Sequence, residues 1–259
     1  MGNILAGLSR FADADRLYAR SWDLSQNDPS LLGSRAGNYL TWTGDVSGAL
    51  DILAATPESL RDHGLTHVYR AGMLARQGEI MPAITAYERV RVVLAGDGNS
   101  GPRNLGILAT YRIGQLEARL GHGARAAELY AEALAAALQY SKDFPDLKNG
   151  AENLVVVHAL RKERTEALAA IDEAMRIAVR THDAIQVVGV RWTKAEMLAI
   201  LGDTDAAIGE LRAIQEAGYA SGYDLRLDLE WEPLRGDAKF QQLMKEAEAR
   251  ADAQPRPKK

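Results

Sequence analysis

Several things are missing from this chain of 259 residues, and each absence narrows the options. It contains no cysteine, which excludes disulfide bonds, thiolate metal sites and cysteine nucleophiles. No run of about eighteen apolar residues is present, so no segment is a candidate transmembrane helix. An excess of one charge is also lacking, because 31 Lys and Arg stand against 35 Asp and Glu. Nucleic-acid-binding proteins usually gather Lys and Arg on one face, so this balance argues against a nucleic-acid partner.

These absences favour a cytoplasmic protein without membrane insertion, with the extracytoplasmic portion of a larger membrane-anchored protein as the alternative. The hydrophobic fraction of 47% is typical of a folded domain. No strand pattern is convincing, and apolar residues recur instead at helical spacing along most of the chain.

A four-residue skeleton recurs along the chain at nearly even intervals. It consists of a glycine, an alanine five residues later, a bulky residue four beyond that, and a smaller residue three further on. The full copies are Gly44–Ala49–Leu53–Thr56, Gly78–Ala83–Tyr87–Val90, Gly121–Ala126–Tyr130–Ala133 and Gly202–Ala207–Leu211–Ile214, and the weaker ones are Ser9–Ala14–Tyr18–Ser21 and Lys162–Ala167–Ile171–Ala174. The alanines at 14, 49, 83, 126, 167 and 207 are separated by 35, 34, 43, 41 and 40 residues. Even spacing of this kind indicates an internal repeat.

The spacing within each copy predicts a pair of helices. Steps of four and three place the alanine, the bulky residue and the last residue on one helical face. The glycine marks a turn, because it tolerates backbone angles that other residues avoid. A second apolar-periodic segment precedes each turn, so each unit reads as helix, turn, helix. One such pair cannot bury its apolar face alone, and stacked neighbours must supply the core.

This skeleton resembles the tetratricopeptide repeat (TPR) family, in which small residues occupy helix crossings and an aromatic lies between them. The family's small residue in the first helix is matched by Gly37, Ala71, Gly114 and Ala195. The resemblance covers about residues 1–217 and implies an all-α, right-handed α-solenoid of about six helix pairs. Lys162 departs from the turn glycine, and the family's closing proline is absent. An irregular alanine-rich helical bundle is the alternative fold.

Residues 218–250 form a predicted C-terminal cap, and residues 251–259 a disordered tail. The segment "LRLDLEWEPLRGDAKFQQLMKEAEAR" is similar to segments that close the TPR arrays of bacterial signalling proteins. "EWEPLRGD" reads as an extended turn before an amphipathic helix, with buried anchors at Trp231, Leu234, Phe240 and Leu243. At the other end the first helix is only half the expected length, which favours a chain cut from a longer protein over a shortened capping helix.

No group of residues predicts catalysis, a metal or a cofactor. His63 and His67 are four apart, as paired metal ligands are, but no third ligand follows at a recognisable spacing, so a surface pair is favoured. Asp97, Asn99 and Gly101 resemble part of a calcium loop whose terminal glutamate is missing, so residues 95–104 are predicted to be a flexible loop that accounts for the step of 43.

The concave face is the predicted site. In the family the first helices line a groove, and its pattern carries over to seven candidate partner-binding residues: Ser34, Asn38, Tyr111, Gln115, Glu152, Trp192 and Glu196. Trp192 and Tyr111 are the expected apolar anchors, although either could pack between helices instead. The carboxylate clamp of some family members is not expected, because only Asn38 of its residue set is present.

The resemblance implies a non-catalytic scaffold that binds a peptide or partner protein in the groove. The alternative is a regulatory or sensor region, cut from a bacterial kinase, cyclase or winged-helix regulator, that binds a ligand or drives self-association.

Overall fold

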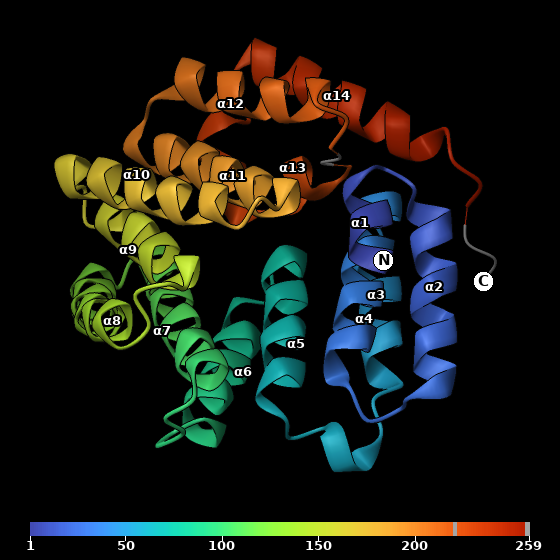
Figure 1. Ribbon diagram of the computed structural model, residues 1–259, viewed down its shortest axis with the longest axis horizontal. Coiled ribbons are helices and arrows are strands. Elements are labelled where there is room, and N and C mark those ends of the chain that lie inside the picture. The colour runs from blue at the N-terminus through green and yellow to red at the C-terminus, as the bar shows by residue number, and fades with distance from the viewer. Residues whose placement is uncertain (220–221, 257–259) are drawn as a thin grey trace.

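The recurring skeleton folds into pairs of antiparallel helices, as the sequence predicts. In the computed structural model, which describes residues 1–219 and 222–256, every regular element is a helix (Figure 1). The pairs are α1 (Gly2–Gly7) with α2 (Phe11–Leu24), α3 (Pro29–Thr43) with α4 (Val46–Ala54), α5 (Gly64–Gln77) with α6 (Ile80–Val93), α7 (Ser100–Arg119) with α8 (Gly123–Asp143), α9 (Lys148–Leu160) with α10 (Arg164–Arg180), and α11 (Ala184–Leu201) with α12 (Thr204–Glu216). A short 3-10 helix, η1 (Glu58–Leu60), precedes α5. The all-α stack of six pairs is therefore confirmed.

The turn inside every pair has the same backbone handedness. Each predicted turn position has a positive φ: Ser9 (57°), Gly44 (70°), Gly78 (87°), Gly121 (81°), Lys162 (64°) and Gly202 (89°). A left-handed residue at this place ends one helix and turns the chain toward the next. Because the two non-glycine positions share the geometry, the weak copies of the skeleton are true repeats.

Small residues allow the helices of a pair to lie close together. The six alanines of the skeleton, at 14, 49, 83, 126, 167 and 207, are all buried. At Gly114 an added Cβ would lie 2.6 Å from the Tyr130 ring, so only glycine fits that crossing. Gly37 differs from the prediction, because a Cβ there meets nothing within 4 Å. It faces an open space rather than a helix crossing, and the buried neighbour Ala36 fills the core.

The first helices of successive pairs form one inner wall. Helix α3 contacts α5, α5 contacts α7, α7 contacts α9, and α9 contacts α11. In Figure 1 the second helices α8 and α12 lie toward the outside of the curve, beyond α7 and α11 respectively. This arrangement gives the chain a concave side, where the predicted groove residues lie.

The C-terminal segment closes the curve. It consists of α13 (Asp224–Leu227), the 3-10 helix η2 (Leu229–Leu234) and α14 (Ala238–Asp252). The predicted extended turn in "EWEPLRGD" is therefore wrong over η2, where the backbone is helical. The predicted anchors Trp231, Leu234, Phe240 and Leu243 are confirmed as fully buried.

Helix α14 contacts both α12 and α3, which lie at opposite ends of the stack (Figure 1). Phe11, Trp42 and Ala251 share one buried cluster, and the Gln254 side chain accepts a hydrogen bond from the Phe11 amide at 2.9 Å. The curved stack is thus joined end to end by its own C-terminal helix.

Some element boundaries differ from those expected from the sequence. The expected loop at 95–104 is shorter, because α7 begins at Ser100, and the step of 43 arises from the length of α7, which has 20 residues. The 21 residues of α8 lengthen the following step of 41. Asp97 accepts a hydrogen bond from the Asn99 amide at 2.9 Å in that turn. Helix α12 ends one residue before the predicted boundary at 217, and α14 includes residues 251–252 of the predicted tail. Residues 220–221 of the predicted cap and 257–259 of the tail lie outside the described residues.

Candidate interaction groove

The predicted groove residues all lie on the inner helices, but they differ in how accessible they are. Asn38 and Tyr111 are each only 5% exposed. The Asn38 amide donates to the Phe11 carbonyl at 3.1 Å, and the Tyr111 ring lies 5.5 Å from the Arg112 guanidinium. In this conformation neither offers much surface to a partner.

The other predicted residues make polar contacts along the same wall. Gln115 accepts from Arg112 at 3.0 Å, and Glu152 pairs with Lys148 at 2.6 Å. Ser34 of α3 lies beside Tyr69 of α5. Each of these three predicted residues remains partly exposed.

Trp192 and Glu196 form a unit on α11. The Trp192 indole N–H donates to the Glu196 carboxylate at 3.0 Å. The Trp192 ring meets Trp231 edge-on, with centroids 5.4 Å apart and planes at 87°. Trp231 comes from η2, so the predicted aromatic anchor already contacts an aromatic from the chain's own C-terminal segment.

Part of that C-terminal segment lies across the inner wall, and we call its residues 223–235, which include α13 and η2, the inner segment. Its first hydrogen bonds are to α3: the Tyr223 amide donates to the Thr41 carbonyl, and the Thr41 hydroxyl donates to Asp224, both at 2.9 Å. The inner segment therefore begins against the third helix and continues across α5 and α7.

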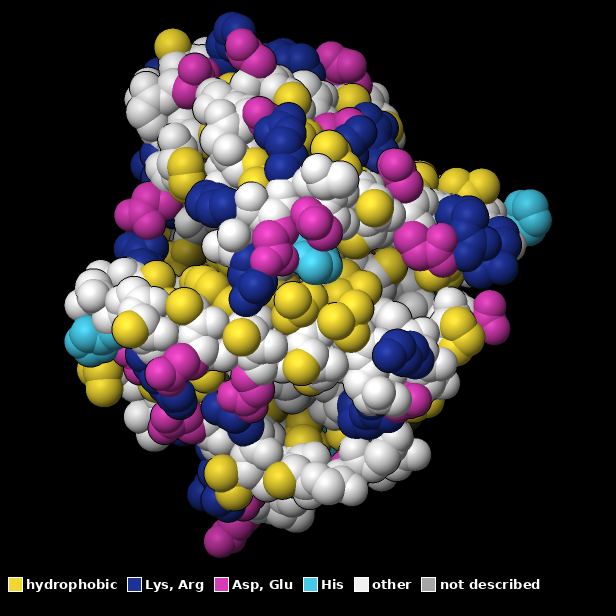
Figure 2. Space-filling model, turned by 90° about the vertical axis from the view of Figure 1, so that its left-hand side faces the viewer, with side chains coloured by type: hydrophobic (Ala, Val, Ile, Leu, Met, Phe, Trp, Pro, Cys, Tyr) yellow, Lys and Arg dark blue, Asp and Glu magenta, His cyan; other side chains and the backbone are white. Residues whose placement is uncertain are grey.

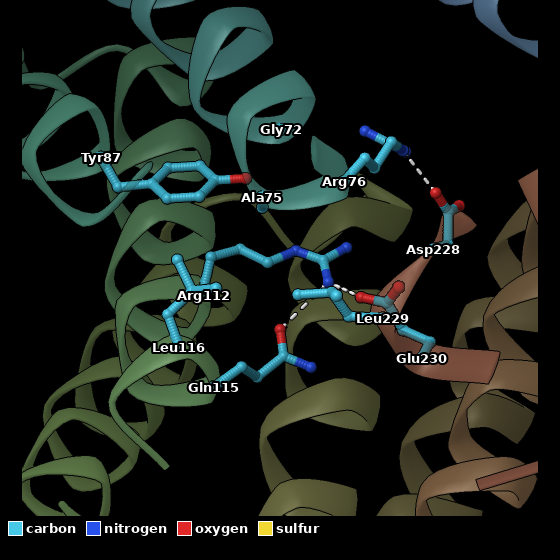
Figure 3. Close-up of a pocket in the computed structure, with 10 residues that line it drawn as sticks. All are labelled: Gly72, Ala75, Arg76, Tyr87, Arg112, Gln115, Leu116, Asp228, Leu229 and Glu230. Carbon is cyan, nitrogen blue, oxygen red and sulfur yellow. Dashed lines mark hydrogen bonds and ion pairs between the residues drawn. The ribbon is translucent and has the colours of Figure 1, made fainter. Parts of the chain in front are cut away.

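Arginines of the inner wall hold the acidic residues of the inner segment (Figure 3). Arg76 at the end of α5 forms an ion pair with Asp228, and Arg112 in α7 forms one with Glu230. Arg119, seven residues further along α7, pairs with Glu232 at 2.5 Å. In Figure 3 Arg76 and Arg112 both point toward the inner segment. Charged hydrogen-bonded pairs of this kind are stronger than neutral ones, and removing one partner of a buried pair is costly.

The concave side retains two cavities of different size. One of about 50 Å³ lies around Arg76, Arg112 and Gln115, beneath the inner segment, and has room for a few water molecules. The other, which we call the central cavity, has about 480 Å³ and lies between α1, α2, α3, α5, α11 and α13. Three predicted groove residues, Ser34, Asn38 and Trp192, line the central cavity.

Two carboxylates on this side have strongly altered acidity. Burial raises the pKa of Asp224 to about 7, and the negative charge of Asp228 adds to the rise. Burial likewise raises the pKa of Glu196 to about 7, although the positive charge of Arg112 opposes it. Both groups are therefore poised to change charge near neutral pH.

The arginines and the inner segment were not predicted from the sequence. Arg112 is three residues before Gln115, so it shares a helical face with a predicted groove residue, and Arg76 lines the same small cavity as Gln115. The alternating acids Asp228, Glu230 and Glu232 were a matching signal of opposite charge. Their pairing depends on the path of the chain after α12, which local spacing does not reveal.

Other candidate features stay outside the groove. His63 caps α5 by accepting from the Leu65 amide at 3.2 Å, while His67 contacts Asp62 at 2.9 Å. Across residues 1–219 and 222–256 no group of three or more His, Asp or Glu is placed to hold a metal ion, and no helix in these ranges has the length and hydropathy to cross a membrane. Figure 2 shows hydrophobic side chains in a band across one outer face, bordered by mixed positive and negative charges.

Comparison with known proteins gives similarity at the level of structure. No family model and no curated protein matches the chain. Cut9 of the APC/C hetero-tetramer Cut9-Hcn1 is similar with a TM-score of 0.41 and 14% identity, over 95% of this chain and 54% of that one. Yeast Tom70 is similar with a TM-score of 0.38 and 16% identity, over 93% of this chain and 58% of the Tom70 chain. The TPR2AB domain of yeast Sti1, in complex with pHSP90, is similar with a TM-score of 0.31 and 18% identity, over 97% of this chain and 95% of the Sti1 chain.

The chain is similar to TPR-repeat structures. It spans a little over half the length of the Cut9 and Tom70 chains. At such low TM-scores the similarity has no bearing on the site, and the TPR-like character rests on the six left-handed turns and the buried alanines described above.

Proposed function

We propose that this TPR-like chain is a non-catalytic protein-interaction scaffold, and that its inner wall binds an acidic segment of a partner protein or peptide. The observation that supports this most is the inner segment itself. Arg76, Arg112 and Arg119 pair with its acidic residues, while Trp192 contacts its tryptophan. The wall thus recognises a sequence that alternates carboxylates with a large aromatic side chain.

The partner would take the place of the inner segment in part or whole. Of the seven predicted contact residues, Gln115 lines a cavity together with Glu230, and Trp192 contacts Trp231. The other five remain proposed contacts on the same wall: Ser34, Asn38, Tyr111, Glu152 and Glu196. Since the inner segment is joined covalently to the wall, its effective concentration is high, and a partner must compete with it. The exposed pair of Arg119 with Glu232 is the easiest contact to exchange, because solvent-exposed ion pairs contribute little stability.

A labelled peptide with the sequence of residues 225–236, LRLDLEWEPLRG, tests this proposal on the full chain. The host is the Glu230→Gln/Glu232→Gln variant, in which the competing segment has lost two charges. We expect fluorescence anisotropy to show peptide binding at least about tenfold tighter than in the unaltered chain, because one good charged contact can be worth that factor.

Two controls define the outcome. Adding Arg112→Gln to the same host should abolish the gain, and a peptide with its three carboxylates replaced by amides, LRLNLQWQPLRG, should bind poorly to every variant. Equal binding of both peptides, or binding that ignores Arg112→Gln, would contradict recognition by the arginines.

A further inference from the structure

The central cavity is not filled by the inner segment. Its volume of about 480 Å³ falls in the usual range for small-molecule sites. It lies between the N-terminal pairs and α11, and it shares Arg76, Trp192 and Asp228 with the peptide path proposed above, whereas Arg112 does not line it. A ligand of the central cavity would therefore adjoin the partner of the inner wall, and its dependence on Asp224 distinguishes the two proposals.

The lining is aromatic on several sides. Tyr18, Tyr69 and Trp192 contribute rings, with Leu40 and Met73 as further apolar surface. Such rings offer a negatively polarised face to a positive charge, and an apolar surface to the body of an organic molecule.

The charges of the lining do not balance. Asp224 and Asp228 face it, with Arg76 as the single positive side chain. The Arg76 guanidinium forms its ion pair with Asp228 and acts on Asp224 through its charge alone. Among the described residues, the hydrogen-bond donor to the Asp224 carboxylate is the Thr41 hydroxyl, at 2.9 Å. A buried carboxylate without a cation in direct contact is costly, and the pKa of Asp224, which burial and Asp228 raise against the opposing charge of Arg76, reflects that cost.

A further group lacks a partner. Asn38 lines the same cavity and is 5% exposed, yet its amide oxygen accepts no hydrogen bond from the described residues. The unsatisfied amide oxygen calls for a hydrogen-bond donor and the excess carboxylate calls for a positive charge, and an ammonium group supplies both. An anionic ligand would instead face two carboxylates and an arginine that is already paired.

We propose that the central cavity binds a small organic ammonium ion, with Asp224 as its counter-charge, Asn38 as a hydrogen-bond acceptor, and Tyr18, Tyr69 and Trp192 around its apolar body. Binding would supply the positive charge that the cavity lacks. It would also connect α3, α11 and α13, which contribute Asn38, Trp192 and Asp224 respectively.

Benzylammonium, benzyl alcohol and benzoate test the charge requirement, since they share a ring and differ in charge. Isothermal titration calorimetry of the full chain at about pH 8, above the pKa of Asp224, should show benzylammonium binding at least about tenfold tighter than the alcohol, and no binding of benzoate. Equal affinities for the amine and the alcohol would overturn the proposal, as would no binding of the amine at up to about 10 mM.

Two variants test the location. Gly37→Leu places a side chain in the cavity, where an added Cβ meets nothing within 4 Å, and it should remove amine binding. Gly209→Leu, at an exposed position of α12, is the control and should leave binding unchanged. Asp224→Asn keeps an acceptor for Thr41 and should weaken amine binding at least about tenfold. Unchanged binding in both cavity variants would place the amine elsewhere and overturn the proposal, whatever the outcome of the peptide experiment.

Discussion

Lys162 occupies a backbone position that suits glycine better. Its φ of 64° matches the glycines at the equivalent turns, and its ammonium donates to the Ile200 carbonyl at 2.5 Å. A left-handed conformation costs a residue with a Cβ roughly 1–2 kcal/mol. The Lys162 hydrogen bond is exposed, so losing it on substitution by glycine would offset little of the stability gained by removing the backbone strain.

Lys162→Gly should therefore raise the free energy of unfolding by about 1 kcal/mol, measured by urea denaturation. Gly202→Ala is the matched control, because it introduces a Cβ at an equivalent turn with φ of 89° and should lower stability by a similar amount. A destabilising Lys162→Gly would mean that the hydrogen bond to Ile200 outweighs the backbone strain.

Trp192 shows what residue types alone leave open. A tryptophan on an inner helix fits both a partner anchor and a packing residue, and the choice depends on Trp231, which lies 39 residues further along the chain and meets it edge-on. In the present conformation Trp192→Ala should cost about 2–3 kcal/mol, because it removes an aromatic pair and leaves a space beside Trp231. Trp192→Phe should lose clearly less, and thermal unfolding followed by circular dichroism distinguishes the two. An Ala variant with an unchanged melting temperature would favour the anchor.

At the scale of helices, the repeat pattern predicted the helix pairs and the turns within them. The alanine spacing located the second helix of each pair, and the turn position was identifiable even where Ser9 and Lys162 replace glycine. What could not be predicted was helix length: Pro102 lies in the first turn of α7, where proline is tolerated, so the Gly/Pro-rich stretch that predicted a loop is partly helical. The path of the inner segment was equally hidden, because it depends on contacts far apart in sequence.

Helix crossings at the skeleton alanines leave no room for larger side chains. Ala126→Leu and Ala207→Leu should each lower stability by about 1–3 kcal/mol, since both alanines are buried between the helices of a pair. Urea denaturation measures the loss. Ala131→Leu, at an exposed position of α8, is the control and should be nearly neutral. Neutral behaviour at Ala126 or Ala207 would show that the crossing there can widen.

For the whole molecule, the buried carboxylates predict how stability depends on pH. The pKa values of Asp224 and Glu196 rise from the ordinary 3.8 and 4.5 to about 7 on folding. Between about pH 4 and pH 7 the folded chain binds more protons than the unfolded chain. The contribution of these two groups to the free energy of unfolding is therefore largest below about pH 4 and is lost as the pH rises through about 7.

The melting temperature should accordingly be higher at about pH 6 than at about pH 8, by roughly 2–4 °C for each kcal/mol of unfolding free energy that is lost over this interval. Asp224→Asn and Glu196→Gln should flatten this dependence, whereas Asp51→Asn, at an exposed site on α4, should leave it unchanged. A melting temperature that rises over the same interval in the unaltered chain would contradict the acidity of these two groups.

The contact of α14 with α3 also bears on how the chain reaches its final form. In an open repeat array each unit contacts only its neighbours, so it can complete its packing as soon as the next unit has been synthesised. Here the surroundings of Trp42 are complete only when Ala251, about 200 residues later, has been added. During synthesis on the ribosome the first pairs must therefore persist with an unfinished apolar face, which makes the nascent chain a natural client for chaperones until residues 238–252 have emerged.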